Sequence, residues 1–459
     1  MKRRDFIKLS LVTGSAILFP QYIYARDLDV NKINFSSAVY NDNKAQTIII
    51  FLYGGASQLA GNLSNLDEIE TQSQSNYRQY FGTMTKTTHN FWEQAGGDAM
   101  ETLLANGDMT LFRTCYSQVR EDNNNKAHGV CTLQNQLGTF DPDAGGALTN
   151  LAQILEANHV ISDTTRMPFV TMEGESKFYT QGRTAVSSYL KPVGINENFE
   201  NPYARDSVRR WYYYTDEERD SAPDSYWKSD AEGGFDPALT NAMDTIAQQH
   251  NAPGKIKDAF TKRKESSDFI NTLANTSTPD LGEDAYPENS DFARKLEAAV
   301  KIMVNNPDTK VLTLGTAGLG SWDDHSEARN YVRRMRDLFY TLKAAMAHLK
   351  AESKEQQINI MVFAEFGRNV NLNNAKGWDH GNLQNLYVLG GKGYFNHKGV
   401  VGETELTGTG AVNRLFLKPA ANSYWFEPLS IAATLYKIYG IENPEIMTDD
   451  YPVIEPLFS

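Results

Sequence analysis

The stretch 310–364 decides the fold class, because it contains KVLTLG at 310–315, a helical pattern at 328–349 and INIMVFA at 358–364. The two short apolar runs are typical of buried strands. Between them, apolar residues recur at three- and four-residue steps, which indicates one buried face of a helix. A strand, a helix and a second strand in this order predict a right-handed crossover between parallel strands.

The same alternation extends over most of the chain. Further strands are expected at 46–53, 108–115, 168–172 and 386–389, and further helices at 292–304 and 429–439. The pattern predicts an α/β fold, with a mostly parallel central sheet covered on both faces by helices. We expect a single domain over 26–459 with a polar, Tyr-rich insertion at about 190–290. The insertion has aromatic residues at 211–214. It could be a functional segment, such as a lid or a partner-binding surface, or it could consist of ordinary surface helices and loops.

The first 25 residues predict an export signal. A basic start with Arg3 and Arg4 leads into an apolar stretch at 9–19, and Ala25 is a suitable residue for cleavage. The pattern RRDFIK at 3–8 favours the twin-arginine route over a plain secretory signal or an uncleaved anchor. We therefore expect a periplasmic or extracellular protein, exported in the folded state.

Composition excludes several classes of protein. The chain of 459 residues has a net charge of −13. Removal of the leader takes away four basic residues and one acidic residue, so the net charge of the mature chain is −16. A nucleic-acid binder is not expected to be this acidic. After the leader, no apolar stretch is long enough for a transmembrane segment. Two cysteines, Cys115 and Cys131, cannot form a disulfide framework, and whether they form one bridge is left open.

Polar side chains gather where strands are expected to end or begin. SWDDH at 321–325 follows one strand, EFGR at 365–368 follows the next, and WDHG at 378–381 precedes the sixth. Ligands of parallel sheets bind outside the carboxyl ends of the strands, and carboxylate and imidazole groups together suit a divalent metal ion. We expect Asp323, His325, Glu365 and His380 to be metal ligands. Two of them also have a purely structural alternative: Glu365 could form an ion pair with Arg368, and His380 could cap a turn.

Neighbouring residues receive other roles. Asp324 stands three residues before Glu327, the spacing of a capping box, so we interpret it as a helix cap. Asp379 is either a ligand or a residue that orients His380. His128 follows the second expected strand and is expected to reach the same rim.

These motifs resemble one family. The twin-arginine leader, Gly54-Gly55 after the first strand, GSWDDH at 320–325, AEFGR at 364–368, DHG at 379–381 and the helix near 431–435 are similar in order and spacing to a large family of exported bacterial proteins known as a domain of unknown function. That family belongs to the alkaline phosphatase and sulfatase clan. The resemblance covers most of the mature chain and is strongest from about residue 310.

The resemblance implies an alkaline phosphatase/sulfatase-like fold and one or two divalent ions, such as zinc, calcium, magnesium or manganese. It implies Asp323, His325, Glu365 and His380 as the ligands. Beside them, we expect His128, Asp379 and Arg368 to support the ligands or to contact substrate. The chain departs from the family's pattern because no Asp soon follows Gly54-Gly55, and Ala127 stands where members tend to have Ser. Ser57 is then the remaining candidate for a nucleophile, and its hydroxyl would need a base or a metal for activation.

Two functions follow from these residues. The first is an exported metal-dependent hydrolase of a small anionic ester, a phosphate or a sulfate. The second is a non-catalytic exported protein on a degenerate scaffold of the same kind, which binds an unknown partner protein.

Overall fold

The computed structural model describes residues 28–72, 77–173, 176–182, 186–197, 199, 245, 269–316, 318–409, 411 and 414–459. The leader expected at 1–25 lies outside these residues. So do the aromatic residues at 211–214 and most of the insertion expected at about 190–290.

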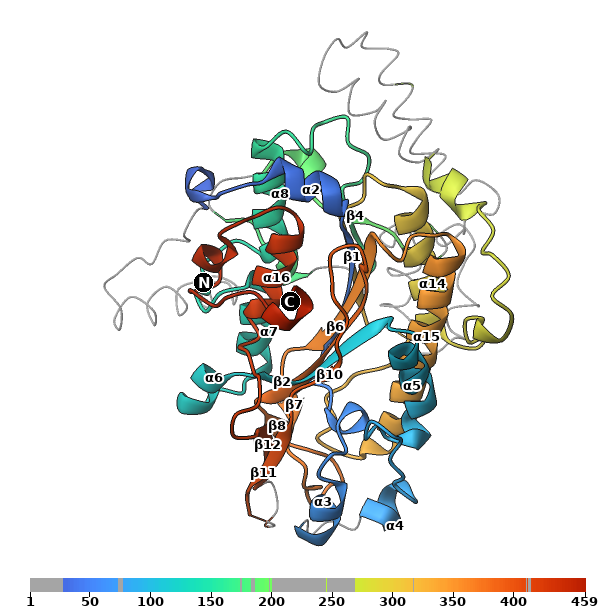
Figure 1. Ribbon diagram of the computed structural model, residues 1–459, viewed down its shortest axis with the longest axis vertical. Coiled ribbons are helices and arrows are strands. Elements are labelled where there is room, and N and C mark those ends of the chain that lie inside the picture. The colour runs from blue at the N-terminus through green and yellow to red at the C-terminus, as the bar shows by residue number, and fades with distance from the viewer. Residues whose placement is uncertain are drawn as a thin grey trace, which may run out of the picture.

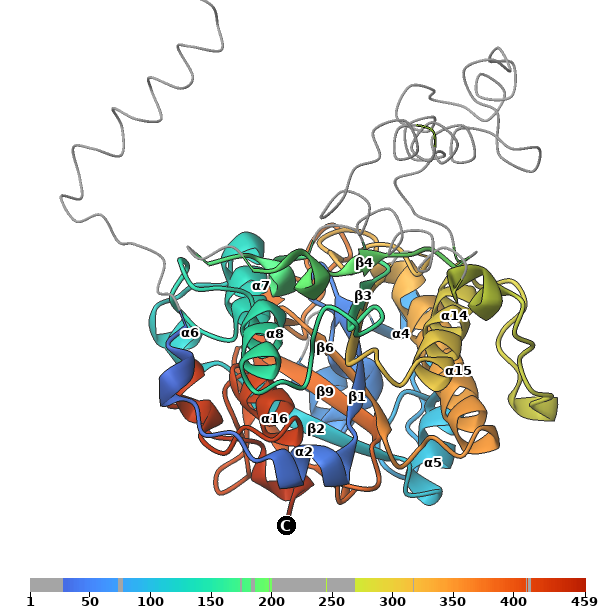
Figure 2. The same ribbon diagram turned by 90° about the horizontal axis from the view of Figure 1, so that it is seen from above.

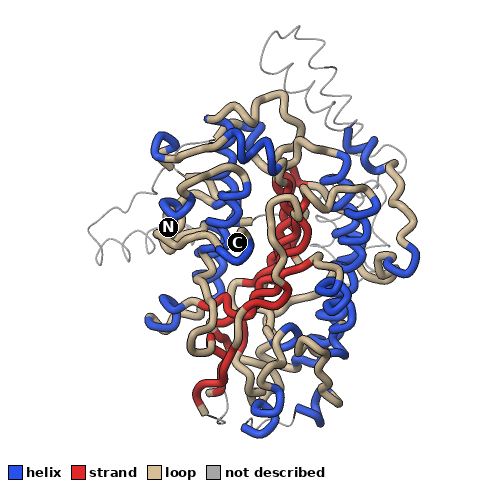
Figure 3. Tube along the Cα trace, in the orientation of Figure 1, coloured by secondary structure: helices blue, strands red, loops and turns tan. Residues whose placement is uncertain are grey.

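A central sheet of eight strands runs through the molecule (Figure 1 and, with strands in red, Figure 3). In spatial order its strands are β10 (Gly399–Val401), β2 (Met109–Tyr116), β9 (Leu383–Gly390), β6 (Ile358–Ala364), β1 (Gln46–Leu52), β5 (Val311–Gly315), β3 (Phe169–Thr171) and β4 (Val193–Gly194). All six strands expected from the sequence are present within a few residues of their expected bounds.

The sheet is parallel except at one strand. β1 pairs in parallel with β5 and with β6, whereas β9 is antiparallel to both β6 and β2. The reversal of β9 places its beginning at the same edge as the carboxyl ends of β1, β5 and β6. The segment before β9, which contains His380, therefore reaches the edge where the other polar loops lie.

Both faces of the sheet are covered by helices, as Figure 2 shows. One face carries α2 (Ser37–Asn43), α7 (His128–Leu137), α8 (Ala147–Ala157) and α16 (Ser430–Ile438), and the other carries α5 (Gly97–Ala105), α14 (Asp291–Asn305) and α15 (Tyr331–Ala351). Successive residues of β1 alternate between the two cores: Ile48 and Ile50 belong to one, Ile49 and Phe51 to the other. The predicted fold class, a mostly parallel sheet between two helical layers, is confirmed.

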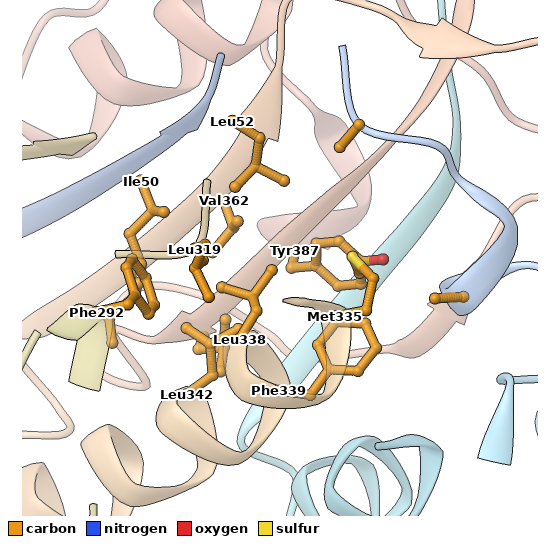
Figure 4. Packing of buried hydrophobic residues seen from close by; sticks show 14 of the residues in the cluster. Ile50, Leu52, Phe292, Leu319, Met335, Leu338, Phe339, Leu342, Val362 and Tyr387 are labelled. Atoms are coloured by element: carbon orange, nitrogen blue, oxygen red, sulfur yellow. The ribbon is translucent and has the colours of Figure 1, made fainter. Parts of the chain in front are cut away.

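The helix α15 forms much of the core that contains Ile48 and Ile50. Its Leu338 and Leu342 are fully buried and point toward Ile50 and Val362 of the sheet (Figure 4). Truncating one such leucine to alanine typically costs 2–5 kcal/mol. The apolar face read from the sequence is thus the face that holds α15 on the sheet.

Smaller elements complete the described part of the chain. They are the helices α3 (Leu66–Gln72), α4 (Tyr77–Phe81) and α6 (Gln118–Asp122) and the two-stranded pairs β7 (Gly367–Arg368) with β8 (His380–Gly381) and β11 (Thr404–Gly408) with β12 (Leu415–Pro419). Cys115 and Cys131 are both buried and unbridged. Among the described residues, no helix has the length and apolar character needed to cross a membrane.

Candidate metal centre

Four side chains meet at the edge where β1, β5 and β6 end. They are His128 at the first turn of α7, Asp323 and His325 in the loop after β5, and His380 at the start of β8. One nitrogen or carboxylate oxygen from each lies within 4.8 Å of those of the others. The sequence predicted Asp323, His325 and His380 for this group, and the structure adds His128.

Close backbone contacts fix the loop that carries Asp323. Gly54 has a φ of +105°, and a Cβ atom there would lie 2.4 Å from the amide nitrogen of Asp323. The carbonyl of Tyr53 also accepts a hydrogen bond of 3.1 Å from the amide of Trp322. Glycine at position 54 therefore permits both the turn and the close approach of the two loops.

Glu365 lies behind His128, outside the group of four. Its buried carboxylate is 2.5 Å from Nδ1 of His128, and it accepts a hydrogen bond of 3.0 Å from the amide of Gly54 and another from the hydroxyl of Thr132. A carboxylate that receives three donors fixes the proton of His128 on Nδ1. The unprotonated Nε2 of His128 then faces the group, 3.3 Å from Asp323 Oδ1.

His380 presents a second free imidazole nitrogen. Its Nδ1 donates to the carbonyl of Lys126, which leaves Nε2 unprotonated, and Nε2 is buried without a hydrogen-bond partner among the described residues. Burial, with the nearby positive charge of Arg368, lowers the pKa of His380 to about 4. A neutral imidazole with an unpartnered buried nitrogen has the form in which histidine binds metal ions.

Asp323 is the charged member of the group. Burial alone would raise the pKa of its carboxyl, but the hydrogen bond and charge of Arg368 outweigh this, and the pKa is lowered. Its Oδ1 lies 2.8 Å from Arg368 Nη2 and also contacts His325 Nδ1. At neutral pH the group therefore offers one carboxylate and three imidazoles, a donor set that suits zinc and related divalent ions.

Asp324 does not cap the long helix, contrary to our expectation. Its carboxylate accepts from Arg334 Nη2, one of the two contacts being 2.6 Å, and both side chains are buried. The helix α15 begins later, at Tyr331, after a short turn over Ala328–Asn330. The capping-box spacing was misleading because α15 begins only at Tyr331, well after Asp324, and the carboxylate of Asp324 pairs instead with Arg334 in the first turn of α15.

The sequence as a whole matches a family model described as "Protein of unknown function (DUF1501)" over residues 44–431. The chain belongs to this family. The matched region includes every residue of the group of four. No curated protein matches the sequence of this DUF1501 member.

Solved structures give only distant likenesses to this DUF1501 chain. Ps i-CgsB in complex with k-i-k-neocarrahexaose is 10% identical with a TM-score of 0.38, over 90% of this chain and 75% of that one. The lipoteichoic acid synthase LtaP from Listeria monocytogenes is 10% identical with a TM-score of 0.34, over 90% and 77%. The phosphonate monoester hydrolase SpPMH from Silicibacter pomeroyi is 13% identical with a TM-score of 0.35, over 90% and 76%.

The remaining expected residues are not members of the group of four in this family member. The Ser57 hydroxyl is buried and accepts a hydrogen bond of 3.4 Å from the amide of Leu59. Asp379 lies within 3.4 Å of the side-chain amide of Asn373, so it supports the loop rather than joining the group. Arg368 has no exposed side-chain surface, and its charge is turned toward Asp323.

An open hollow of about 430 Å³ adjoins the group. Its lining residues are Tyr53, Gly54, His128, Thr316, Gly320, Ser321 and Asp323. Asp323 is the one acidic residue of this described lining, which contains no lysine or arginine. Within this described lining, a bound ion would be a source of positive charge facing a ligand.

Sequence reasoning missed two buried residues beside this site. Arg120 donates to the carbonyl of Glu365 at 2.9 Å and to the side chain of Asn135 at 2.6 Å, so it ties α6 and α7 to the end of β6. Glu173 follows β3, next to Tyr53, and neither of its buried carboxyl oxygens has a hydrogen-bond partner among the described residues. The strand-end rule that found Asp323 would have found Glu173 as well.

Burial is the main reason that the pKa of Glu173 is raised to about 7. The hydroxyls of Ser176, Tyr53 and Thr313 lie near enough to oppose this rise in part, but none has the geometry of a hydrogen bond to the carboxyl group. Glu173 therefore keeps its proton to higher pH than an ordinary glutamate.

Proposed function

We propose that this protein is an exported, metal-dependent hydrolase-like protein that cleaves phosphate or sulfate esters on an alkaline phosphatase/sulfatase-like scaffold. The observation that carries the proposal is the set of four donors within 4.8 Å of one another beside an open hollow. Two of these donors, Nε2 of His128 and of His380, are buried nitrogens without hydrogen-bond partners among the described residues. Such nitrogens are costly to bury unless something binds them.

The residues of this chain would divide the work as follows. His128, Asp323, His325 and His380 would hold the ion, and Glu365 with Thr132 would keep His128 in the correct tautomer. A bound divalent ion supplies Lewis-acid polarisation of an ester oxygen and charge for an anionic substrate. The ion's charge matters here because the mature chain has a net charge near −16, and Arg368 is buried against Asp323 rather than facing the hollow.

The metal content of the purified mature protein tests the proposal. We expect about one equivalent of divalent ion or more, and its loss when His325 and His380 are both replaced by alanine, because both side chains offer donors. His89→Ala is the matched control, since His89 lies on the surface against Glu101. A folded wild-type protein that binds no zinc, manganese, calcium or magnesium would contradict the proposal.

A turnover assay separates the two functions that the sequence left open. With the ion bound, aryl phosphates and aryl sulfates should be hydrolysed by the wild type and not by the double variant. The alternative is a non-catalytic binding or assembly protein, and the burial of the Ser57 hydroxyl against Leu59 favours it. Metal binding without turnover of any aryl ester would support that alternative.

Export rests on the leader alone, through the pattern RRDFIK at 3–8. We expect the protein outside the cytoplasm after cell fractionation. Replacing Arg3 and Arg4 by lysine should retain it in the cytoplasm as the uncleaved precursor. Unchanged export of that variant would point to a plain secretory signal.

A further inference from the structure

Arg368 lies beside the group of four as a permanent cation. Its Nη2 is 2.8 Å from Asp323 Oδ1, and its Nη1 is 3.4 Å from His325 Nδ1. The guanidinium thus contacts two of the donors that would hold an ion. Its charge is present whether or not an ion is bound, because arginine does not lose its proton in proteins.

Backbone carbonyls hold this guanidinium in place. Nε donates to Gly55 at 2.7 Å and Nη1 to Trp378 at 2.9 Å, while Nη2 reaches Gly54 and, at 3.3 Å, Trp322. These carbonyls belong to three different loops, and the Arg368 side chain has no exposed surface. Arg368 would therefore have to break several hydrogen bonds to leave, so it stays beside Asp323 when an ion binds.

Among the described residues that contact the group, free carboxylates for a second ion are missing. Two-metal centres hold their ions about 3.5–4 Å apart and need further carboxylates. The described carboxylates that contact the group or its loops are already satisfied: Glu365 by His128, Gly54 and Thr132, and Asp324 by Arg334. Asp379 accepts from Asn373, and Glu173 forms no hydrogen bond to any of the four. The four donors of the group suffice for one ion.

We propose that this centre binds a single divalent ion, and that the guanidinium of Arg368 takes the place of a second cation beside Asp323. The inference rests on the proposed function, because it assumes that the group of four binds metal. It adds the number of ions and the role of Arg368. Arg368 is a positioning residue that also supplies a fixed charge.

Titration of the metal-free wild-type protein with Mn²⁺ tests the number of ions. We expect saturation at one equivalent and the electron paramagnetic resonance spectrum of isolated Mn²⁺. Two equivalents with a spin-coupled spectrum would overturn this inference and leave the proposed function standing. No binding of Mn²⁺ or Zn²⁺ by the folded protein would overturn both.

Two variants test the charge of Arg368. Arg368→Lys keeps a positive charge, so its affinity for Mn²⁺ should stay within about threefold of the wild-type affinity. Arg368→Gln removes a charge that repels the ion, so it should bind Mn²⁺ more tightly than the wild type, on the order of tenfold. Circular dichroism and thermal unfolding would report whether each variant folds. Weaker binding by both folded variants would leave Arg368 a purely structural role and overturn the charge argument, while the stoichiometry of the wild type decides the number of ions by itself.

Discussion

Asp323 and Asp324 are adjacent in sequence, and each contacts an arginine, yet their surroundings are opposite. The side chain of Asp324 is 8% exposed and that of Asp323 is 42% exposed. Arg334 holds Asp324 through two contacts to its carboxylate, whereas Arg368 meets only Oδ1 of Asp323. Asp324 is thus part of the scaffold, and Asp323 keeps an oxygen available for a ligand.

The electrostatics follow the same division. Burial raises the pKa of Asp324 even though Arg334 opposes the rise, while the interactions of Asp323 with Arg368, His325 and His128 overcome the smaller effect of burial and lower its pKa. Burial rather than the presence of an arginine therefore separates the two carboxyl groups. Two further buried carboxyls near this edge, Glu173 and Glu365, extend the comparison because neither side chain has an arginine partner among the described residues.

The largest expected effect is on stability, from Asp324→Asn. The substitution leaves Arg334 buried without an anionic partner, and breaking a buried pair on one side typically costs about 3–5 kcal/mol. Urea unfolding of the variant and the wild type at pH 7 measures the loss. A loss below 1 kcal/mol would mean that Asp324 is no more a part of the scaffold than Asp323.

Glu173→Gln sharpens the comparison by testing a buried carboxyl with no cation. The folded state holds the pKa of Glu173 near 7, above its ordinary value of 4.5, so folding favours the protonated form. The protonated Glu173 therefore makes its full contribution to the free energy of unfolding below about pH 4.5. That contribution is lost as the pH rises toward 7, which lowers the free energy of unfolding by about 3 kcal/mol. We expect Glu173→Gln, which cannot ionise, to lack this loss.

Urea unfolding of both proteins at pH 4.5 and at pH 8 is the measurement. The difference in stability between variant and wild type should move in favour of the variant at the higher pH. Glu352→Gln, at the exposed end of α15, is the control and should show no such change. Equal pH dependence of Glu173→Gln and the wild type would show that Glu173 ionises normally in the folded protein.

The sequence predicted the frame of the site because periodicity reports burial. The strands 310–315 and 358–364 and the helix between them are confirmed as β5, β6 and α15, and the strand-end rule correctly placed Asp323 and His325 at one edge. The direction of β9 was beyond this reasoning. Had β9 been parallel, the loop before it would lie at the opposite edge, and His380 would be far from Asp323.

Pairing between distant side chains was the other part that the sequence could not supply. Asp324 matched a capping box, but the loop geometry gives it to Arg334, ten residues away. Glu365 was expected among the ligands, yet its carboxylate contacts Nδ1 of His128, at 2.5 Å, and is not one of the four donors. Such outcomes depend on how loops from different strands meet, and local spacing carries no information about that.

Glu365→Gln tests a buried carboxylate that is satisfied by neutral donors. An amide offers one acceptor oxygen and adds two hydrogens of its own, so it cannot accept from His128, Gly54 and Thr132 together. His128 is then free to carry its proton on Nε2, where the ion would bind. We expect the affinity for Zn²⁺ to fall about 10–100-fold, with Glu352→Gln unchanged, measured by competition with a chelating dye.

A fall in affinity in both variants would trace the effect to net charge rather than to the tautomer. No fall in Glu365→Gln would mean that Glu365 does not orient His128. In either case the difference from Asp324→Asn should remain, because Glu365 leaves no unpaired arginine behind.

The smallest expected effect on stability comes from Asp323→Asn, and it decides whether the opening comparison holds. Asp323 is substantially exposed, and ion pairs of exposed groups contribute at most about 1 kcal/mol. Arg368 also keeps the carbonyls of Gly55 and Trp378 as acceptors, whereas Arg334 in Asp324→Asn keeps the carbonyl of Ser321 but loses the charge of its partner. We expect the free energy of unfolding of Asp323→Asn, measured with urea, to lie within about 1 kcal/mol of the wild-type value. The same variant should no longer retain a divalent ion, because the only carboxylate of the group of four has become an amide. A metal-binding variant, or one destabilised as much as Asp324→Asn, would show that Asp323 belongs to the scaffold and that the arginine contact, not burial, governs both residues.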